Sequence, residues 1–307
     1  IQPCAQTRNK LHSLGIARVK PWSPSYTRGC RACRNKIRRI KTVISDRSHN
    51  RITSQNTVNH QNLTYVPLQS LNSKSEKKCT LSLVNTRSVR NKSCELMDCV
   101  IDNQSDICVL TETWLTNLDS VSRANLKQHG FSFQDFPCQS DHRGGGTGIL
   151  FKDSLSVSKQ ECGEKHSFEY SEWFITWQHS NSRVKLCVIY RPPYSEEHPV
   201  SFQSFFSEFE DYLESIILSS EPICIMGDFN IHMENTDCHN QQRLDNIFKS
   251  FGLVQHISIP THQSGHTLDL IITRNSDDIM LSQPTSGDYI SDHCFVITKL
   301  TFPNPGS

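Results

Sequence analysis

Short apolar runs, several of them closed by a glycine or a polar residue, recur along the chain from residue 79 onward. Short runs rich in Val, Ile, Leu and Cys, with no helical spacing, are typical of buried strands. The pattern predicts strands at residues 81–85, 107–110, 148–151, 173–177, 184–190, 222–226, 268–272 and 294–300. A series of buried strands in one continuous stretch indicates a folded domain that begins near residue 79.

Apolar residues at helical spacing interrupt this series in three places. Leu96, Cys99 and Val100 predict a helix over 93–103, and residues 202–218 form an amphipathic segment. A further helix is expected at 243–251, where Gly252 would end it. Strands outnumber helices, and the helices fall between groups of strands. This order favours two sheets packed face to face with helices on the outside.

Residues 1–78 differ in composition: they have no sustained apolar periodicity and contain many Arg, Lys, Ser, Asn, Gln and Thr residues. They hold 16 Lys and Arg against 2 Asp and Glu, whereas residues 79–307 hold 16 against 29. Such low hydrophobicity does not offset the entropy of ordering, so we predict a mostly disordered basic arm. Its densest basic stretch, 28–41, is either a nucleic-acid or nuclear-import patch or a solvated remnant without a role.

The cysteines and the apolar runs limit the class of protein. Thirteen cysteines is an odd number without framework spacing, which favours a reducing compartment. Cys30 and Cys33 form a C-x-x-C pair with no second pair nearby, so we do not expect zinc there. No membrane-spanning run or signal peptide is expected. The chain begins with Ile1, which we interpret as a fragment or a reading frame that lost its start.

Polar side chains at strand ends suggest a chemistry. The strand over 222–226 is followed by Asp228 and Asn230, and Asp292 and His293 directly precede the strand over 294–300. Carboxylates are hard ligands for a divalent cation, and Asp or His can accept a proton from water. Amides can donate hydrogen bonds to phosphate oxygens. These groups together are what metal-assisted phosphodiester hydrolysis requires.

Seven blocks of residues carry a family resemblance. In chain order they read LVNTRS (83–88), LTETW (110–114), GGGTG (144–148), YRPP (190–193), GDFN (227–230), TLDL (267–270) and SDH (291–293). With these blocks, residues 79 to about 300 resemble the endonuclease/exonuclease/phosphatase family, in the branch carried by non-LTR (LINE-type) retrotransposons. The resemblance implies an α/β (α+β) fold, a four-layer αββα sandwich of two mainly antiparallel sheets with flanking helices. It also implies Mg²⁺ as the cofactor, with Mn²⁺ as a possible substitute.

The resemblance implies metal-binding roles for three of the strand-end residues. Glu112 would ligate the ion, Asn85 would assist it, and Asp292 would be a further ligand or support one. Repair-type members of the family carry an acidic residue two positions after the asparagine, where this chain has Arg87. Arg87 removes one possible ligand and adds a phosphate-binding cation, so the choice between one and two metals stays open.

The catalytic roles also follow from the resemblance. Asp228 would orient or deprotonate the attacking water, and Asn230 would hold a phosphate oxygen. If the strand continues, the two side chains would point the same way, with Phe229 in the core. Asp269 lies in an apolar run and needs a partner, which His293 would supply. Whether Asp228 or His293 is the general base is open at this point.

Further residues would shape the substrate site. Tyr190 would contact the phosphate or the leaving group, and Arg87, Arg191 and Trp114 are predicted to contact nucleic acid. Residues 144–148 lack the ending of a P-loop and are interpreted as a backbone turn. His262 and His266 are expected to border a DNA groove and not to bind zinc, because no third ligand has suitable spacing.

The leading hypothesis is a Mg²⁺-dependent endonuclease domain that nicks double-stranded DNA and leaves a 3′-hydroxyl. Two alternatives remain: another phosphoesterase of the same fold, acting on abasic-site DNA or phosphoinositides, or a catalytically silent nucleic-acid binder decayed from a mobile element. The proteins it resembles continue into a reverse transcriptase, which this sequence does not include. An intracellular and nuclear location is expected, without contact to a membrane.

Overall fold

The computed structural model describes residues 78–302, except for residues 129, 140–143, 178–181 and 197. The predicted basic arm, its stretch 28–41 and the Cys30–Cys33 pair lie outside the described residues, so these predictions stay untested. Lys78, the last residue assigned to the arm, is the first residue of a strand.

Two six-stranded sheets form the centre of the folded part. The first sheet has the order β11-β12-β1-β2-β4-β3, and the second has the order β5-β6-β7-β8-β10-β9. The strands of the first sheet are β1 (Lys78–Asn85), β2 (Ile107–Thr111), β3 (Phe131–Phe136), β4 (Thr147–Lys152), β11 (Thr285–Tyr289) and β12 (Cys294–Thr301). Those of the second are β5 (Leu155–Glu164), β6 (Glu169–Trp177), β7 (Arg183–Tyr190), β8 (Ile223–Asp228), β9 (Leu253–Gln255) and β10 (Asp269–Arg274).

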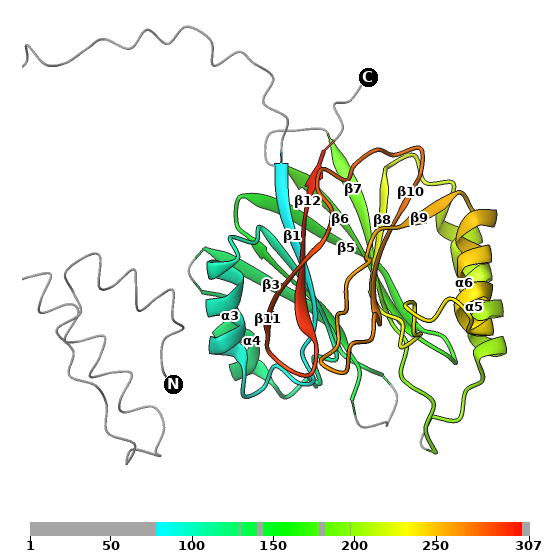
Figure 1. The fold of residues 1–307 in the computed structure, drawn as a ribbon. Helices are drawn as coiled ribbons and strands as arrows, with labels where there is room; N and C mark the ends of the chain where they lie inside the picture. The colour runs from blue at the N-terminus through cyan, green and yellow to red at the C-terminus, as the bar shows by residue number, and fades with distance from the viewer. Residues whose placement is uncertain (1–77, 129, 140–143, 178–181, 197, 303–307) are drawn as a thin grey trace, which may run out of the picture. The chain divides into compact units, whose positions relative to one another are not determined.

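Within the described residues, four helices cover the outer faces of the two sheets. They are α3 (Ser93–Asp102), α4 (Ser120–Leu126), α5 (Phe202–Ile216) and α6 (His239–Ser250). Helices α3 and α4 lie on one side of the sheet pair and α5 and α6 on the other (Figure 1). All sheet pairings are antiparallel except β1–β2 and β7–β8. The predicted four-layer αββα sandwich of two mainly antiparallel sheets is confirmed.

Three apolar clusters hold the layers together. The cluster between the sheets includes Trp173 and Met226, a second joins the outer face of the second sheet to α5 and α6, and a third joins the first sheet to α3 and α4. Phe209 of α5 and Phe229 after β8 are fully buried in the second cluster, with ring centroids 5.6 Å apart. Burying such a side chain contributes roughly 1.5–3 kcal/mol.

The strand register brings the polar strand ends to one edge of the sandwich. In the first sheet the parallel β1 and β2 pair Asn85 with Thr111, the residue before Glu112. In the second sheet Tyr190 pairs with Asp228 across the parallel β7 and β8, and Asp228 pairs with Asp269 across β8 and β10. Hydrogen bonds between the two sheets at this edge define the candidate site described below. Among the described residues, none of the helices has both the length and the apolar content needed to cross a bilayer.

Candidate active site

The GDFN segment ends β8 and forms a tight turn, not a continued strand. Asn230 has a positive φ of 48°, which asparagine tolerates better than most residues. Its backbone N–H donates to Oδ1 of Asp228 at 2.9 Å, and its Nδ2 donates to Oδ2 of Asp228 at 3.2 Å. The strand ends at Asp228, so the condition for a shared strand face is not met, and the turn brings these two side chains together. Phe229 is buried in the core as expected.

Asn85 connects the two sheets at the site. Its Nδ2 donates to Oε1 of Glu112 at 2.9 Å and to Oδ2 of Asp228 at 2.8 Å. Asn85 is buried, so both hydrogen bonds form away from bulk water, where they are electrostatically stronger. One amide thus holds a carboxylate of each sheet in a fixed position.

Glu112 follows β2 in a left-handed conformation, with φ of 50°, and Trp114 has φ of 53°. The indole Nε1 of Trp114 donates to Oε2 of Glu112 at 3.1 Å. Both oxygens of Glu112 therefore have a protein donor, one from Asn85 and one from Trp114. Trp114 therefore orients Glu112. The sequence predicted only that Trp114 contacts nucleic acid, and this hydrogen bond was not foreseen.

Asp269 and His293 form the buried pair that the sequence indicated. Nδ1 of His293 lies 2.7 Å from Oδ2 of Asp269, and Nε2 lies 4.0 Å from Oδ2 of Asp228. The hydrogen bond to Asp269 fixes the ring so that Nε2 faces Asp228. Burial lowers the pKa of His293, but the negative charges of Asp269, Asp228 and Asp292 outweigh it and raise this pKa above its usual range.

Asp228 is fully buried and close to a second carboxylate. Burial and the negative charge of Asp269 raise its pKa, and His293 and Asn85 oppose this shift. Asp228 also accepts hydrogen bonds from Asn85 and Asn230. A carboxylate held in this way is positioned to accept a proton.

Asp292 lies at the entrance of the site in an ion-paired cluster. Oδ2 of Asp292 is 2.5 Å from Nη1 of Arg87 and 3.3 Å from Nε2 of His262. Burial raises the pKa of Asp292, but the positive charges of Arg87 and His293 lower it by more, so the net shift is downward. Arg87 is half-exposed and stands beside the site, as its predicted role toward phosphate requires.

Tyr190 ends β7 and Arg191 follows it, but the two side chains face different surroundings. Burial and the negative charges of Glu112 and Asp228 hold the pKa of the Tyr190 phenol well above its usual range. Arg191 is buried, its Nη1 donates to the carbonyl oxygens of Phe229 and Asn230 at 3.3 Å each, and its guanidinium lies over the Phe202 ring. The prediction that Arg191 contacts nucleic acid does not fit this position, because the side chain supports the GDFN turn from inside.

A cavity of about 670 Å³ opens over these residues. The predicted residues that line it are Arg87, Glu112, Tyr190, Asn230, Asp292 and His293. His262, expected to border a DNA groove, is also in the lining. Asn85, Asp228 and Asp269 lie behind this surface and are nearly or fully buried.

Glu169 is a lining residue that sequence reasoning missed. It begins β6, is nearly fully buried, and accepts a hydrogen bond from the backbone N–H of Gly146 at 2.6 Å. Burial raises its pKa to about 7. The sequence signal was weak: a glutamate among apolar residues, upstream of the predicted strand at 173–177. Gly144, Gly145 and Gly146 all have positive φ before β4, consistent with the predicted backbone turn.

Backbone strain is concentrated around the cavity. Among the described residues, seven non-glycine residues have positive φ, and five of them belong to the blocks that carry the site. The five are Arg87, Ser88, Glu112, Trp114 and Asn230. Such conformations cost on the order of 1–3 kcal/mol each and persist where the surroundings enforce them. Their clustering supports a functional use of this edge of the sandwich.

The donor set at this edge fits a hard divalent cation. It is made of carboxylate oxygens, an amide and one imidazole, and oxygen ligands are those that Mg²⁺ prefers. Within the described residues, Oδ1 of Asp269 and Oδ1 of Asp292 are buried and have no hydrogen-bond partner. A buried carboxylate oxygen without a donor is costly, and a bound cation would satisfy it. Asp228, Asp269 and His293 also place one potential ligand atom each within 4.8 Å of one another.

Comparison with known families identifies this constellation. A model of the Endonuclease/Exonuclease/phosphatase family matches residues 80–293, a range that includes all seven blocks. The chain belongs to this family. Its members are metal-dependent nucleases and phosphatases, which makes the chain a candidate phosphoester hydrolase. A search of curated proteins gave no match.

Solved structures share the fold at low sequence identity. The AP endonuclease LMAP from Leishmania major has a TM-score of 0.59 and 14% identity over 74% of this chain and 89% of that one. The endonuclease domain of TRAS1, a telomere-specific non-LTR retrotransposon, has a TM-score of 0.56 and 13% identity over 74% and 99%. The 3′-5′ exonuclease NExo from Neisseria meningitidis has a TM-score of 0.55 and 16% identity over 73% and 99%. At this identity the likeness establishes the fold alone.

Proposed function

We propose that the folded domain is a Mg²⁺-dependent DNA endonuclease of a non-LTR retrotransposon, which hydrolyses one phosphodiester bond of double-stranded DNA. One observation carries this proposal. Asp228, fully buried, is bonded to Asn85 of the opposite sheet and lies 4.0 Å from an imidazole that Asp269 holds in place. An open cavity with a proton acceptor, an oriented imidazole and an amide at its floor suits hydrolysis of a phosphodiester by water.

Asp228 is the residue we propose as the general base. Three donors fix its carboxylate: the Nδ2 groups of Asn85 and Asn230 and the backbone N–H of Asn230. Its carboxylate would take the proton of the attacking water. His293, which keeps its proton because carboxylates surround it, would donate from Nε2 to a non-bridging phosphate oxygen.

Tyr190, Asn230 and Arg87 line the cavity and would position the scissile phosphate. The hydroxyl of Tyr190 stays protonated, since its pKa is raised, and so remains a hydrogen-bond donor. Arg87 offers a guanidinium, which binds phosphate through paired N–H groups. Arg191 has a positioning role, because it holds the backbone carbonyls of Phe229 and Asn230.

Glu112 and the free carboxylate oxygen of Asp292 are the groups we propose as metal ligands, with Asn85 as a supporting amide. Mg²⁺ held there would offset negative charge on the phosphate and on the leaving 3′ oxygen, and Mn²⁺ is expected to substitute. The departing strand end would then be a 3′-hydroxyl, the group that primes DNA synthesis.

The sequence blocks support the retrotransposon branch over other phosphoesterases of this fold. The NTRS, LTETW and YRPP blocks resemble those of retrotransposon endonucleases, with Arg87 in place of an acidic residue. Action on genomic DNA would require a nuclear location, which we propose with it.

One rival activity has support of its own. LMAP, an AP endonuclease, has the same fold, so abasic-site DNA is a second candidate substrate. A catalytically silent binder is disfavoured by the assembled cluster of Asn85, Glu112, Asp228, Asp269 and His293. Decay without selection would be expected to break at least one of these contacts.

Substrate choice tests the proposal. The full chain is incubated with Mg²⁺ and three substrates: intact duplex DNA, the same duplex with one abasic site, and a phosphoinositide. The proposal predicts cleavage of intact duplex at a rate comparable to that of abasic duplex, and no phosphate release from the lipid. Cleavage confined to the abasic duplex or to the lipid would refute the retrotransposon endonuclease but would still show a phosphoester hydrolase.

A further inference from the structure

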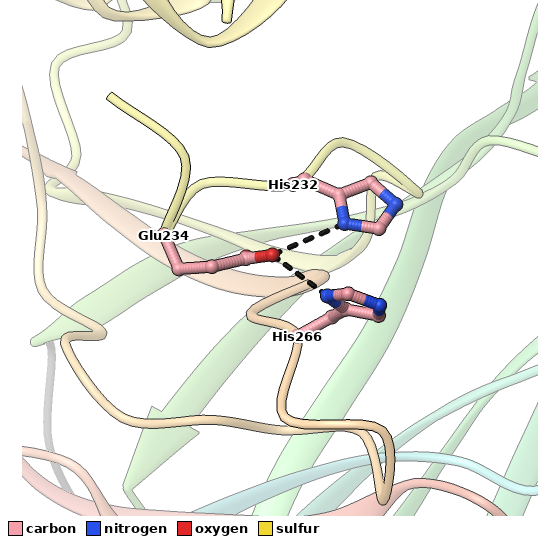
Figure 2. A group of neighbouring side chains, drawn as sticks. All are labelled: His232, Glu234 and His266. Atoms are coloured by element: carbon pink, nitrogen blue, oxygen red, sulfur yellow. Dashed lines mark hydrogen bonds and ion pairs between the residues drawn. The ribbon is translucent and has the colours of Figure 1, made fainter. Parts of the chain in front are cut away.

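Three side chains outside the cavity lining converge on one another. His232 and Glu234 lie on the segment that follows β8, and His266 lies on the segment that precedes β10 (Figure 2). Oε1 of Glu234 lies 3.1 Å from Nδ1 of His232 and 2.7 Å from Nδ1 of His266. The two imidazole rings contact each other edge to face, with centroids 4.1 Å apart. Figure 2 shows both Nδ1 atoms directed at the same carboxylate oxygen.

The spacing of these atoms fits coordination of one ion. One ligand atom from each residue lies within 4.8 Å of the other two. A tetrahedral Zn²⁺ with bonds of about 2.0–2.1 Å holds its ligand atoms about 3.4 Å apart. The present distances from Glu234 to the two Nδ1 atoms are slightly shorter than that. A small opening of the three side chains would therefore admit an ion, with no change of fold.

The backbone holds the two segments together independently of this cluster. The N–H of Met233 donates to the carbonyl oxygen of Thr267 at 3.1 Å, and the N–H of Phe229 donates to that of Leu268 at 3.0 Å. The N–H of Thr267 donates to Oε2 of Glu234 at 2.9 Å, leaving Oε1 toward the histidines. A ligand carboxylate oriented by a backbone donor is a common feature of protein metal sites.

The ligand types select the class of ion. Two imidazole nitrogens and one carboxylate favour Zn²⁺ or a similar transition-metal ion, whereas Mg²⁺ and Ca²⁺ prefer all-oxygen sites. The side chains of His232, Glu234 and His266 are exposed by 50%, 33% and 39%, so an ion has access from solvent. Three protein ligands would leave a fourth position for water.

We propose that His232, Glu234 and His266 form a binding site for a transition-metal ion such as Zn²⁺, separate from the Mg²⁺ site of the proposed endonuclease. The ion would link the segment after β8 to the segment before β10. These segments begin and end at Asp228 and Asp269, so a bound ion would stabilise the local frame of both carboxylates. It has no part in the hydrolytic step.

This cluster was not predicted from the sequence because its members lie far apart along the chain. The expectation that His266 has no third ligand rested on the residues near it in the chain. Glu234 and His232 lie more than thirty positions earlier, and the pairing of their segment with that of Thr267 brings them together. The structure thus adds Glu234 and His232 as potential ligands beside His266 that spacing in the sequence did not indicate.

Zinc binding to the full chain tests the proposal. The protein is kept reduced and saturated with Mg²⁺, and Zn²⁺ is titrated against a chromogenic chelator. We expect the wild-type chain to bind one more equivalent of Zn²⁺ than the His232→Asn/His266→Asn double variant. Each single variant should raise the Kd at least about tenfold. Co²⁺ in place of Zn²⁺ should give the intense visible absorption of a tetrahedral complex, and this signal should be absent from the double variant.

Controls separate this site from other zinc ligands. His239→Asn changes an exposed histidine at the start of α6 and should leave the extra equivalent unchanged. His293→Ala should also retain it, which would exclude the Asp228–Asp269–His293 group as its location. At a free Zn²⁺ concentration about a hundredfold above Kd, the Tm of the wild type should rise by about 5–10 °C, and that of the double variant should not.

In EDTA the wild type and the double variant should melt together, which would show that the substitutions leave the fold intact. Equal zinc stoichiometry in the wild type and the double variant would overturn the proposal, because the histidines would then only pair with Glu234. None of these readouts depends on DNA cleavage, so a failure of the proposed endonuclease activity would be seen separately.

Discussion

Asn85 has the central position among the site residues, because its one amide group donates to carboxylates from both sheets. Asp269 also orients a neighbour, because it holds the His293 ring with Nε2 toward Asp228. Glu112, Asp228 and His293 are therefore each held in place by a neighbouring side chain. This arrangement makes the rate of hydrolysis sensitive to substitutions that leave charge and volume nearly unchanged.

Asp269→Asn tests the orientation of His293. The new amide would place an NH₂ group or a neutral oxygen against Nδ1, which changes the favoured tautomer and removes the charge that stabilises imidazolium. We expect the cleavage rate to fall by about 10²–10⁴-fold, measured by DNA nicking with Mg²⁺. Asp245→Asn, at a half-buried position on α6 that is ion-paired with Lys249, is the matched control and should keep full activity. An unchanged rate in Asp269→Asn would contradict the role of the pair.

Glu169 gives a prediction about stability and pH. Its pKa is about 7 in the folded protein, raised by burial above the ordinary value of 4.5. The folded state therefore holds a proton that the unfolded state releases between these two values, so stability falls as pH rises through this range. The loss attributable to Glu169 should reach about 3 kcal/mol by pH 8.

Urea unfolding of the wild type and Glu169→Gln between pH 5 and pH 8 measures this contribution. Glutamine keeps an oxygen for the N–H of Gly146 and cannot ionise. The difference in free energy of unfolding between the two proteins should shift in favour of Glu169→Gln as pH rises. A difference that stays constant across the range would show that Glu169 is not protonated in the folded state.

At the scale of elements, the site depends on where β7 and β8 end and where β10 begins. Gly227 adopts φ of 151° in β8, and a Cβ there would collide with the carbonyl group of Ile189 in β7. Only glycine lets β7 and β8 approach this closely while Asp228 turns into the site. The glycine of the GDFN block is thus a requirement of strand packing and not of chemistry.

Gly227→Ala should lower the free energy of unfolding by about 3 kcal/mol, because the methyl group overlaps backbone atoms that cannot rotate away. Gly252→Ala is the matched comparison, since Gly252 also has positive φ, of 64°, but open space around it. There only the conformational cost of about 1 kcal/mol applies. Chemical denaturation measures the free energy of unfolding of both variants. Equal losses in Gly227→Ala and Gly252→Ala would contradict the steric role of Gly227.

Sequence patterns predicted the central strands well because those strands are buried on both faces. β1, β2, β4, β7, β8, β10 and β12 lie where apolar runs placed them, to within a few residues. The strands that were missed, β3, β5, β9 and β11, have at least one edge without a partner strand. β5 reads LSVSKQECGE and is largely solvent-exposed, so backbone pairing and not an apolar pattern defines it. The short helix α4 was missed as well.

The candidate site was predictable where residues lie at or next to the end of a buried strand, as Glu112, Asp228 and Asp269 do. Arg191 was misread because an arginine before two prolines looks exposed in sequence, and its burial over Phe202 depends on α5. Glu169 and the His232–Glu234–His266 cluster were missed because their partners are distant in sequence. Contacts between distant segments are the part that periodicity and spacing do not encode.

At the scale of the whole molecule, neither sheet holds the site alone. Asn85, Glu112 and His293 belong to the first sheet or the segments that adjoin it, and Tyr190, Asp228 and Asp269 belong to the second. The folded domain is acidic, and the basic residues are concentrated in residues 1–78. A bound cation would reverse the local field at the carboxylates, so an acidic domain is compatible with a polyanionic substrate.

Nicking of supercoiled plasmid by the full chain is the decisive test of the proposed endonuclease. The wild type is assayed with Mg²⁺ and with EDTA, His293→Ala is assayed with Mg²⁺, and the nicked product is offered to a DNA polymerase. We predict open-circular plasmid with a polymerase-extendable 3′ end from the wild type with Mg²⁺ only, and a loss of at least about 10²-fold with His293→Ala. A folded wild-type protein that leaves the plasmid supercoiled, or equal nicking by His293→Ala, would contradict the account.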